Sequence, residues 1–104
     1  MGKYKLILAN TAYLDLEQIY AYIAKTLSAP NAANNLMGKI ESKIRDLQVF
    51  PISSPFCNDE SLKLKGYRKL VVNNYIVIYK VDELTETVHI IRILYGASDY
   101  ERQI

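Results

Sequence analysis

The pattern of hydrophobic residues along this chain is helical at first and becomes strand-like from about residue 64. In residues 12–27 the apolar positions recur at spacings of three and four, which predicts an amphipathic helix. The apolar stripe of this helix is formed by Leu16, Ile19, Tyr20, Ile23 and Leu27. Residues 4–9 form a short β-type run ahead of it, and Asn10 or Thr11 is expected to cap the helix.

A second helix is predicted to begin at Pro30, because the residue before a proline disfavours the helical conformation while proline itself suits a first helical turn. Its apolar stripe is Ala33, Leu36, Met37, Ile40, Ile44 and Leu47. Phe50-Pro51 ends it, and the short break between the two helices predicts an antiparallel hairpin. Residues 52–62 lack periodicity and have the composition of an ordered surface loop.

The last third of the chain predicts a three-stranded antiparallel meander. Two runs rich in β-branched and aromatic residues, 64–72 and 75–81, flank Asn73-Asn74, a pair that tolerates the positive φ of a tight hairpin turn. A third run spans residues 87–96. The predicted fold is therefore α+β: an antiparallel sheet, made of the N-terminal strand and this meander, packs on the two-helix hairpin. The order is β-α-α-β-β-β with a short C-terminal helical tail, which Ser98 or Asp99 is expected to cap.

A two-residue turn at Asn73-Asn74 would also fix which side chains share a face of the sheet. Val72 would pair with Tyr75, Leu70 with Val77 and Arg68 with Tyr79. The opposite face would carry Tyr67, Lys69, Val71, Ile76, Ile78 and Lys80. Because the first face holds one charge and the second holds two, we expect the first to meet the helices. The second face would then stay open and need a partner.

Length and composition limit the class of protein. A chain of 104 residues, half of them apolar, is expected to form one compact domain over residues 1–104. No apolar stretch is long enough for a membrane span or a signal peptide, so we expect a soluble, cytoplasmic protein with no membrane partner. Cys57 and His89 are the single cysteine and the single histidine, too few for a structural zinc site, and we expect neither a metal nor a cofactor.

Charge is distributed unevenly although the formal net charge is only +2. Residues 63–81 contain no acid and hold Lys63, Lys65, Arg68, Lys69 and Lys80. This basic surplus on the first two meander strands could contact a partner, or could protect an exposed strand edge from aggregation. His89 lies within a predicted strand and is interpreted as a structural residue.

Three stretches resemble a known family: LKGYRKL at residues 64–70, YIVIY at 75–79 and IIRILYGASD at 90–99. Together with the order of elements, they resemble the RelE/ParE superfamily of bacterial toxins, and the last stretch looks most like the ParE-type branch. The resemblance implies the toxin half of a type II toxin–antitoxin system, associated with plasmid stabilisation and growth inhibition and neutralised by a cognate antitoxin. Members act either as poisons that bind DNA gyrase or as ribosome-dependent mRNA endonucleases.

Some positions depart from the family pattern. Ser98 stands where arginine is common and Ala97 where a basic residue is frequent, while Val72 and Ile76 occupy the strand positions of the nuclease arginines. The resemblance therefore favours gyrase binding, with RNA cleavage and a degenerate toxin that only binds its antitoxin as alternatives. RNA cleavage requires a proton-transfer group and cations near the phosphate, and the remaining candidates are Lys69, Arg92, Tyr95 and Arg102.

These candidates have structural interpretations as well. Arg68 and Arg92 could each pair with an acid, and Tyr95 and Tyr100 could pack the tail against the sheet. For binding to the target or the antitoxin, the candidate residues are Lys63, Lys65, Lys69, Val71, Ile76, Ile78, Lys80, Ser98, Asp99 and Tyr100. We expect an acidic antitoxin segment, disordered alone, to fold across the open basic face that most of them occupy.

Overall fold

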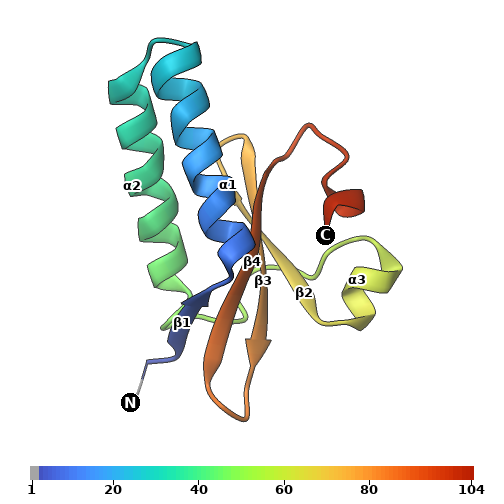
Figure 1. The fold of residues 1–104 in the computed structure, drawn as a ribbon. Helices are drawn as coiled ribbons and strands as arrows, with labels where there is room; N and C mark the ends of the chain where they lie inside the picture. Colours follow the sequence, from blue (N-terminus) through green and yellow to red (C-terminus); the bar gives the residue numbers. More distant parts are fainter. Residues whose placement is uncertain (1–2) are drawn as a thin grey trace.

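A computed structural model describes residues 3–104 of the chain (Figure 1). Residues 1 and 2 of the predicted domain lie outside the described range. The helices and strands, in order, are β1 (Lys5–Leu8), α1 (Asn10–Ala21), a π-helical turn (Tyr22–Thr26), α2 (Pro30–Asp46), α3 (Glu60–Leu64), β2 (Tyr67–Val72), β3 (Tyr75–Asp82), β4 (Thr87–Tyr95) and a 3₁₀ turn (Tyr100–Gln103). The predicted α+β class and element order are confirmed, and α3 is an addition.

The four strands form one sheet in the order β1-β4-β3-β2. The meander is antiparallel, with the predicted pairs Val72 with Tyr75 and Leu70 with Val77. However, β1 pairs in parallel with β4, so the sheet is mixed and the expectation of a wholly antiparallel sheet is wrong at this strand. A parallel pair needs a long crossover connection, which the helical hairpin and the first two meander strands supply.

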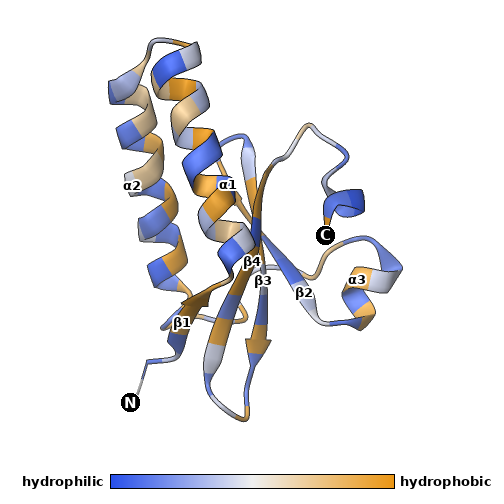
Figure 2. Ribbon diagram, viewed as in Figure 1, coloured by the Kyte–Doolittle hydropathy of each residue, from blue (hydrophilic) through white to orange (hydrophobic). Residues whose placement is uncertain are grey.

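The helical hairpin covers one face of the sheet, and α3 and the C-terminus lie on the other side (Figure 1). The predicted stripe of α2 is buried, with Ile40 and Leu47 each 1% exposed. It packs against side chains from the predicted inner face of the meander, among them Val72, Val77 and Tyr79. Hydrophilic and hydrophobic residues alternate along both long helices in Figure 2, as expected of amphipathic helices packed on one side.

The opposite face of the sheet, hereafter the back face, is partly covered by the chain itself. Ile78 is 0% exposed and forms a small core with Cys57 and Leu62, around which Tyr67, Ile76, Ile91, Tyr100 and Ile104 pack. The expectation that Ile78 is open to a partner is therefore wrong. The aperiodic loop contains α3, capped by the Asp59 carboxylate, which accepts a hydrogen bond from Leu62 N at 3.1 Å.

The predicted caps of the first helix and the tail are also wrong. No side chain caps α1, and Thr11 Oγ1 instead donates to the Ile91 carbonyl at 2.8 Å. In the tail, Ser98 Oγ donates to the Tyr95 carbonyl at 2.6 Å, and the Asp99 carboxylate pairs with Arg102 at 2.9 Å. Thr11, Ser98 and Asp99 thus bond to groups other than the helix termini that they were expected to cap.

Within residues 3–104, no helix is long and apolar enough to cross a membrane. The same range contains no group of three or more His, Cys, Asp or Glu side chains arranged to hold a metal ion.

Candidate partner-binding groove

A β-bulge in β4 determines which side chains face the helices near the end of the sheet. Ile78 pairs with Arg92 but the next residue, Tyr79, pairs with Ile90, so Ile91 is the extra residue. An extra residue reverses the faces of those that follow. Even-numbered residues such as Ile90 point to the helices before the bulge, whereas Ile93 and Tyr95 do so after it.

Helix α1 takes the place of a strand along the edge of β4 beyond the end of β1. Ala9 N donates to the Ile90 carbonyl at 2.9 Å, and Thr11 bonds to Ile91 as described above. One turn further along, the Asp15 carboxylate accepts a hydrogen bond from Ile93 N at 2.9 Å. Side chains of the helix thus satisfy backbone groups that an open sheet edge would expose to water.

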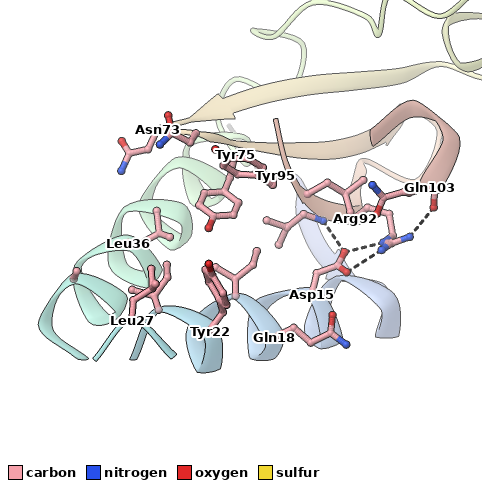
Figure 3. A pocket seen from close by; sticks show the side chains of 16 residues that line it. Asp15, Gln18, Tyr22, Leu27, Leu36, Asn73, Tyr75, Arg92, Tyr95 and Gln103 are labelled. Atoms are coloured by element: carbon pink, nitrogen blue, oxygen red, sulfur yellow. Dashed lines mark hydrogen bonds and ion pairs between the residues drawn. The ribbon is translucent and has the colours of Figure 1, made fainter. Parts of the chain in front are cut away.

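Asp15 also forms a fork-shaped ion pair with Arg92. Arg92 Nε lies 2.7 Å from one Asp15 oxygen and Nη2 lies 2.9 Å from the other, while Nη1 donates to the Gln103 carbonyl at 2.6 Å (Figure 3). The hydrogen bond to Asp15 raises the pKa of Arg92, against the opposing effect of burial. The pair is partly buried and geometrically specific, as bidentate arginine–carboxylate pairs are.

These groups form one wall of a groove of about 840 Å³ between α1, the β2–β3 turn and the end of β4 (Figure 3). Hereafter "the groove" means this space, lined by Asp15, Gln18, Ile19, Tyr22, Ile23, Leu27, Ala32, Leu36, Asn73, Asn74, Tyr75, Arg92, Ile93, Leu94, Tyr95 and Gln103. Tyr22 lies in the π-helical turn, and such turns recur at functional sites.

Three tyrosines dominate the groove. The rings of Tyr75 and Tyr95 meet edge to face, with centroids 5.7 Å apart. The pKa of Tyr75 is raised, first by burial and then by the neighbouring phenols of Tyr95 and Tyr22. Tyr22 and Tyr95 remain 53% and 50% exposed, so both rings offer surface to a bound molecule. Tyrosines of this kind are enriched at protein interfaces because an apolar ring ends in a polar hydroxyl.

The groove is almost neutral. The charged residues that line it are Asp15 and Arg92, which pair with each other. Its other polar side chains are the amides of Gln18, Asn73, Asn74 and Gln103 and the tyrosine hydroxyls. A lining of phenols, amides and aliphatic groups suits an uncharged, partly apolar polypeptide better than a phosphate backbone, which needs unpaired cations.

Comparison with known proteins identifies the family. Residues 6–100 match the family model described as the ParE toxin of the type II toxin–antitoxin system, parDE. The chain belongs to this family. The predicted membership of the RelE/ParE superfamily is thereby confirmed, and the protein is a toxin of a toxin–antitoxin system.

Solved structures agree with the fold of the toxin. It is similar to a chain from "Chromosomal ParDE TA system from P. aeruginosa", with 21% sequence identity, a TM-score of 0.72 and coverage of 89% of this chain and 96% of that one. It is also similar to a chain of the toxin–antitoxin complex RelBE2 from Mycobacterium tuberculosis, at 20% identity and a TM-score of 0.62, covering 89% and 98%. No curated protein sequence is significantly similar to the toxin.

The four candidate nuclease residues lie on different parts of this toxin, with Arg92 and Tyr95 at the groove, Lys69 on β2 and Arg102 in the tail. Arg92 and Tyr95 both line the groove, but Arg92 is bonded to Asp15 and Gln103. Lys69 pairs across the sheet with Ile78, which in turn pairs with Arg92, so two strand spacings, or about 10 Å, separate their backbones. Arg102 lies on the exposed tail and pairs with Asp99.

The candidate binding residues surround the back face rather than the groove. Lys63, Lys65 and Lys80 are exposed, and the Lys80 ammonium lies 5.9 Å from the centre of the Tyr67 ring. Val71 is also exposed, whereas Ile76 packs beside the buried Ile78. Ser98, Asp99 and Tyr100 belong to the tail, where Tyr100 packs on the same small core. Their roles in binding stay predictions.

Sequence reasoning missed most of the groove. No site role is predicted for Asp15 from the sequence, but its carboxylate faces β4 and is buried. Arg92 does pair with an acid, one of the two interpretations considered for it. Arg68 does not, because it donates to the Ser54 carbonyl at 2.7 Å and lies 4.0 Å from the centre of the Phe56 ring. An acid four residues before Ile19, at the border of the apolar stripe, was the signal available for Asp15.

Proposed function

We propose that this toxin inhibits bacterial growth by binding DNA gyrase in the cytoplasm, and that a segment of its cognate antitoxin neutralises it by occupying the groove. The observation that carries the proposal is the groove itself, a neutral, tyrosine-rich site of a size that can hold a polypeptide segment. Two similar structures, described as ParDE and RelBE2 toxin–antitoxin systems, support a protein partner of this kind.

The backbone at the groove supports binding of an extended segment. In a β-strand, alternate residues direct their backbone groups to the same side, so the Ile93 carbonyl and the Tyr95 N–H face the side on which Ile93 N meets Asp15. A partner strand could pair with these groups while its apolar side chains contact Tyr22 and Leu27. Acidic residues flanking that strand would meet Lys65 or Lys80 only where the antitoxin continues around to the back face.

The support for a binding mechanism comes from the separation of the candidate nuclease groups. RNA cleavage needs a group that removes the 2′-hydroxyl proton and cations that stabilise the phosphate in the transition state. The guanidinium of Arg92 already serves two acceptors, and Lys69 and Arg102 lie outside the groove that contains Tyr95. Gyrase binding requires no such cluster.

The first experiment tests neutralisation. The small protein encoded beside the toxin gene is titrated calorimetrically into the parent toxin and into Tyr22→Ala and Tyr95→Ala variants. Each substitution removes an exposed aromatic ring from the groove and should weaken binding at least about tenfold. Tyr13→Ala is the matched control, since Tyr13 is an equally exposed tyrosine of α1 outside the groove lining. Equal losses in all three variants, or none, would place the antitoxin elsewhere.

The second experiment tests the target. Purified toxin should inhibit supercoiling by DNA gyrase and leave ribosome-bound mRNA intact, and its expression should arrest growth unless the antitoxin is present. Cleavage of mRNA with unaffected supercoiling would establish the nuclease alternative. Normal growth at verified soluble expression would instead support a degenerate toxin, and Ser98→Arg would then test whether the missing arginine is the cause.

A further inference from the structure

Arg92 connects the groove to the C-terminal segment, which is defined here as residues 98–104. We propose that the Asp15–Arg92 pair couples the two, so that the C-terminal segment docks more firmly when a peptide occupies the groove. Asp15 and Arg92 act here as positioning residues. The part concerning the peptide rests on the proposed function, whereas the effect of the pair on the segment in the free toxin does not.

The side chain of Arg92 crosses the edge of the sheet. Arg92 lies opposite Ile78, whose side chain is in the back-face core, so the Arg92 side chain leaves the backbone on that face. It ends at Asp15, on the helix that covers the other face. This route is available because β1 ends at Leu8, opposite Ile90, and leaves the edge of β4 free of a neighbouring strand beyond that point. One guanidinium therefore joins both layers of the molecule.

The C-terminal segment is held by few contacts. Tyr100 and Ile104 pack on the back-face core without being fully buried, and the Glu101 carboxylate accepts a hydrogen bond from Asp59 N at 2.9 Å. The bond from Arg92 Nη1 to the Gln103 carbonyl ties the segment to the groove wall. A segment with so few buried contacts opens at low free-energy cost, which supplies the docked and undocked states that coupling requires.

The direction of the coupling follows from solvent exposure. The Arg92–Gln103 hydrogen bond is exposed, and both residues line the groove. A peptide bound there would exclude water from this bond and so strengthen it. By linkage, undocking of the C-terminal segment must weaken binding of the peptide by the same factor. Asp15 contributes to the coupling because it fixes the guanidinium in the orientation that points Nη1 at Gln103.

Hydrogen exchange in the free toxin tests the first part. The Arg102 amide bonds to the Asp99 carbonyl at 3.3 Å within the segment, so its exchange reports whether the 3₁₀ turn of the segment is formed. Asp15→Asn, which keeps the shape but removes the charge, and Arg92→Lys, which keeps the charge but removes the fork, should each speed exchange of amides 100–104 by roughly fivefold. Exchange in α2 serves as the check that the variants are folded. Glu41→Gln, on the exposed face of α2, is the control.

A peptide covering the antitoxin's groove-binding segment tests the second part. At a saturating concentration it should slow exchange of amides 100–104 in the parent and have no such effect in Asp15→Asn. Unchanged exchange in folded Asp15→Asn and Arg92→Lys would overturn the proposal. So would a peptide that binds the groove without slowing exchange. A peptide that does not bind would contradict the proposed function, while the free-toxin experiment would still decide the role of the pair.

Discussion

On the helical face of the sheet, two long helices bury a continuous layer of branched side chains, whereas on the back face a five-residue helix and the C-terminal segment cover a smaller core around Ile78. The first layer comes from segments whose apolar residues recur periodically, and the second comes largely from segments without such a period. The comparison indicates that global stability resides in the first layer, and that the second can loosen without unfolding the protein.

The largest expected effect is on the helical face. Ile40→Ala removes a side chain that is 1% exposed in the centre of α2 and should lower the free energy of unfolding by about 4 kcal/mol. Urea denaturation measures it through the midpoint at constant slope. Ile52→Ala, in the exposed loop after α2, is the control and should change stability by less than about 0.5 kcal/mol. Similar losses for both would mean that α2 does not carry the core.

The next effect concerns the edge that joins the two faces. Asp15→Ala leaves Nε and Nη2 of Arg92 and the Ile93 N–H without their acceptor and should cost about 3 kcal/mol, since removing one partner of this partly buried pair leaves a charge that only the Gln103 carbonyl still contacts. Asp99→Ala breaks the exposed pair with Arg102 and should cost less than about 1 kcal/mol. Denaturation of both variants under the same conditions makes the comparison. If Asp15→Ala lowered the free energy of unfolding by less than Asp99→Ala, water would be able to replace the Asp15 carboxylate.

A smaller loss is expected on the back face. Leu62→Ala should cost about 2 kcal/mol, at the low end for a buried leucine, because the small core lies near the surface and can collapse into the space. Hydrogen exchange should quicken in β2 and residues 98–104 but stay slow in α2. If α2 loosened to the same extent, the two layers would form one cooperative unit and the distinction between them would fail.

The reactivity of the Cys57 thiol measures how readily the back-face core opens. Burial, and next the nearby Glu101 carboxylate, raise the pKa of its thiol above the ordinary value. Alkylation by iodoacetamide at pH 8 should therefore be at least about tenfold slower in the folded toxin than in urea, because the thiolate is the reactive form. Since the folded state disfavours the thiolate, stability should be unaffected below the ordinary thiol pKa and should fall as pH rises above about 8.5. Equal alkylation rates would mean that the small core opens freely.

The helical face could be predicted from sequence because its physics is local and repetitive. The spacing of Ile40, Ile44 and Leu47 gives the buried stripe of α2, and Asn73-Asn74 gives the register that places Val77 and Tyr79 beneath it. The back face could not, because Leu62 and Ile104 come from segments without periodicity and meet Ile78 only through the tertiary fold.

The groove escaped prediction for a related reason. Its tyrosines come from the π-helical turn after α1, from β3 and from β4, and only the bulge at Ile91 brings Tyr95 to the same side as Tyr75. A strict alternation through β4 would have placed Tyr95 on the back face instead. The direction of β1 could not be predicted either, because the pattern of residues 4–9 indicates a strand but not whether it runs parallel to its neighbour.

The bulge at Ile91 also divides β4 into two stretches that can change independently. Before it, Val88 and Ile90 serve the core and tolerate little variation in size, whereas after it Tyr95 projects from the sheet into solvent-accessible space. Related toxins could therefore acquire different partners by substitutions after the bulge, while the residues before it keep the fold. Deleting Ile91 would restore a regular ladder in which Arg92 still opposes Ile78 and Tyr95 still opposes Tyr75, so the groove would keep its tyrosines and only the back-face contact of Ile91 would be lost.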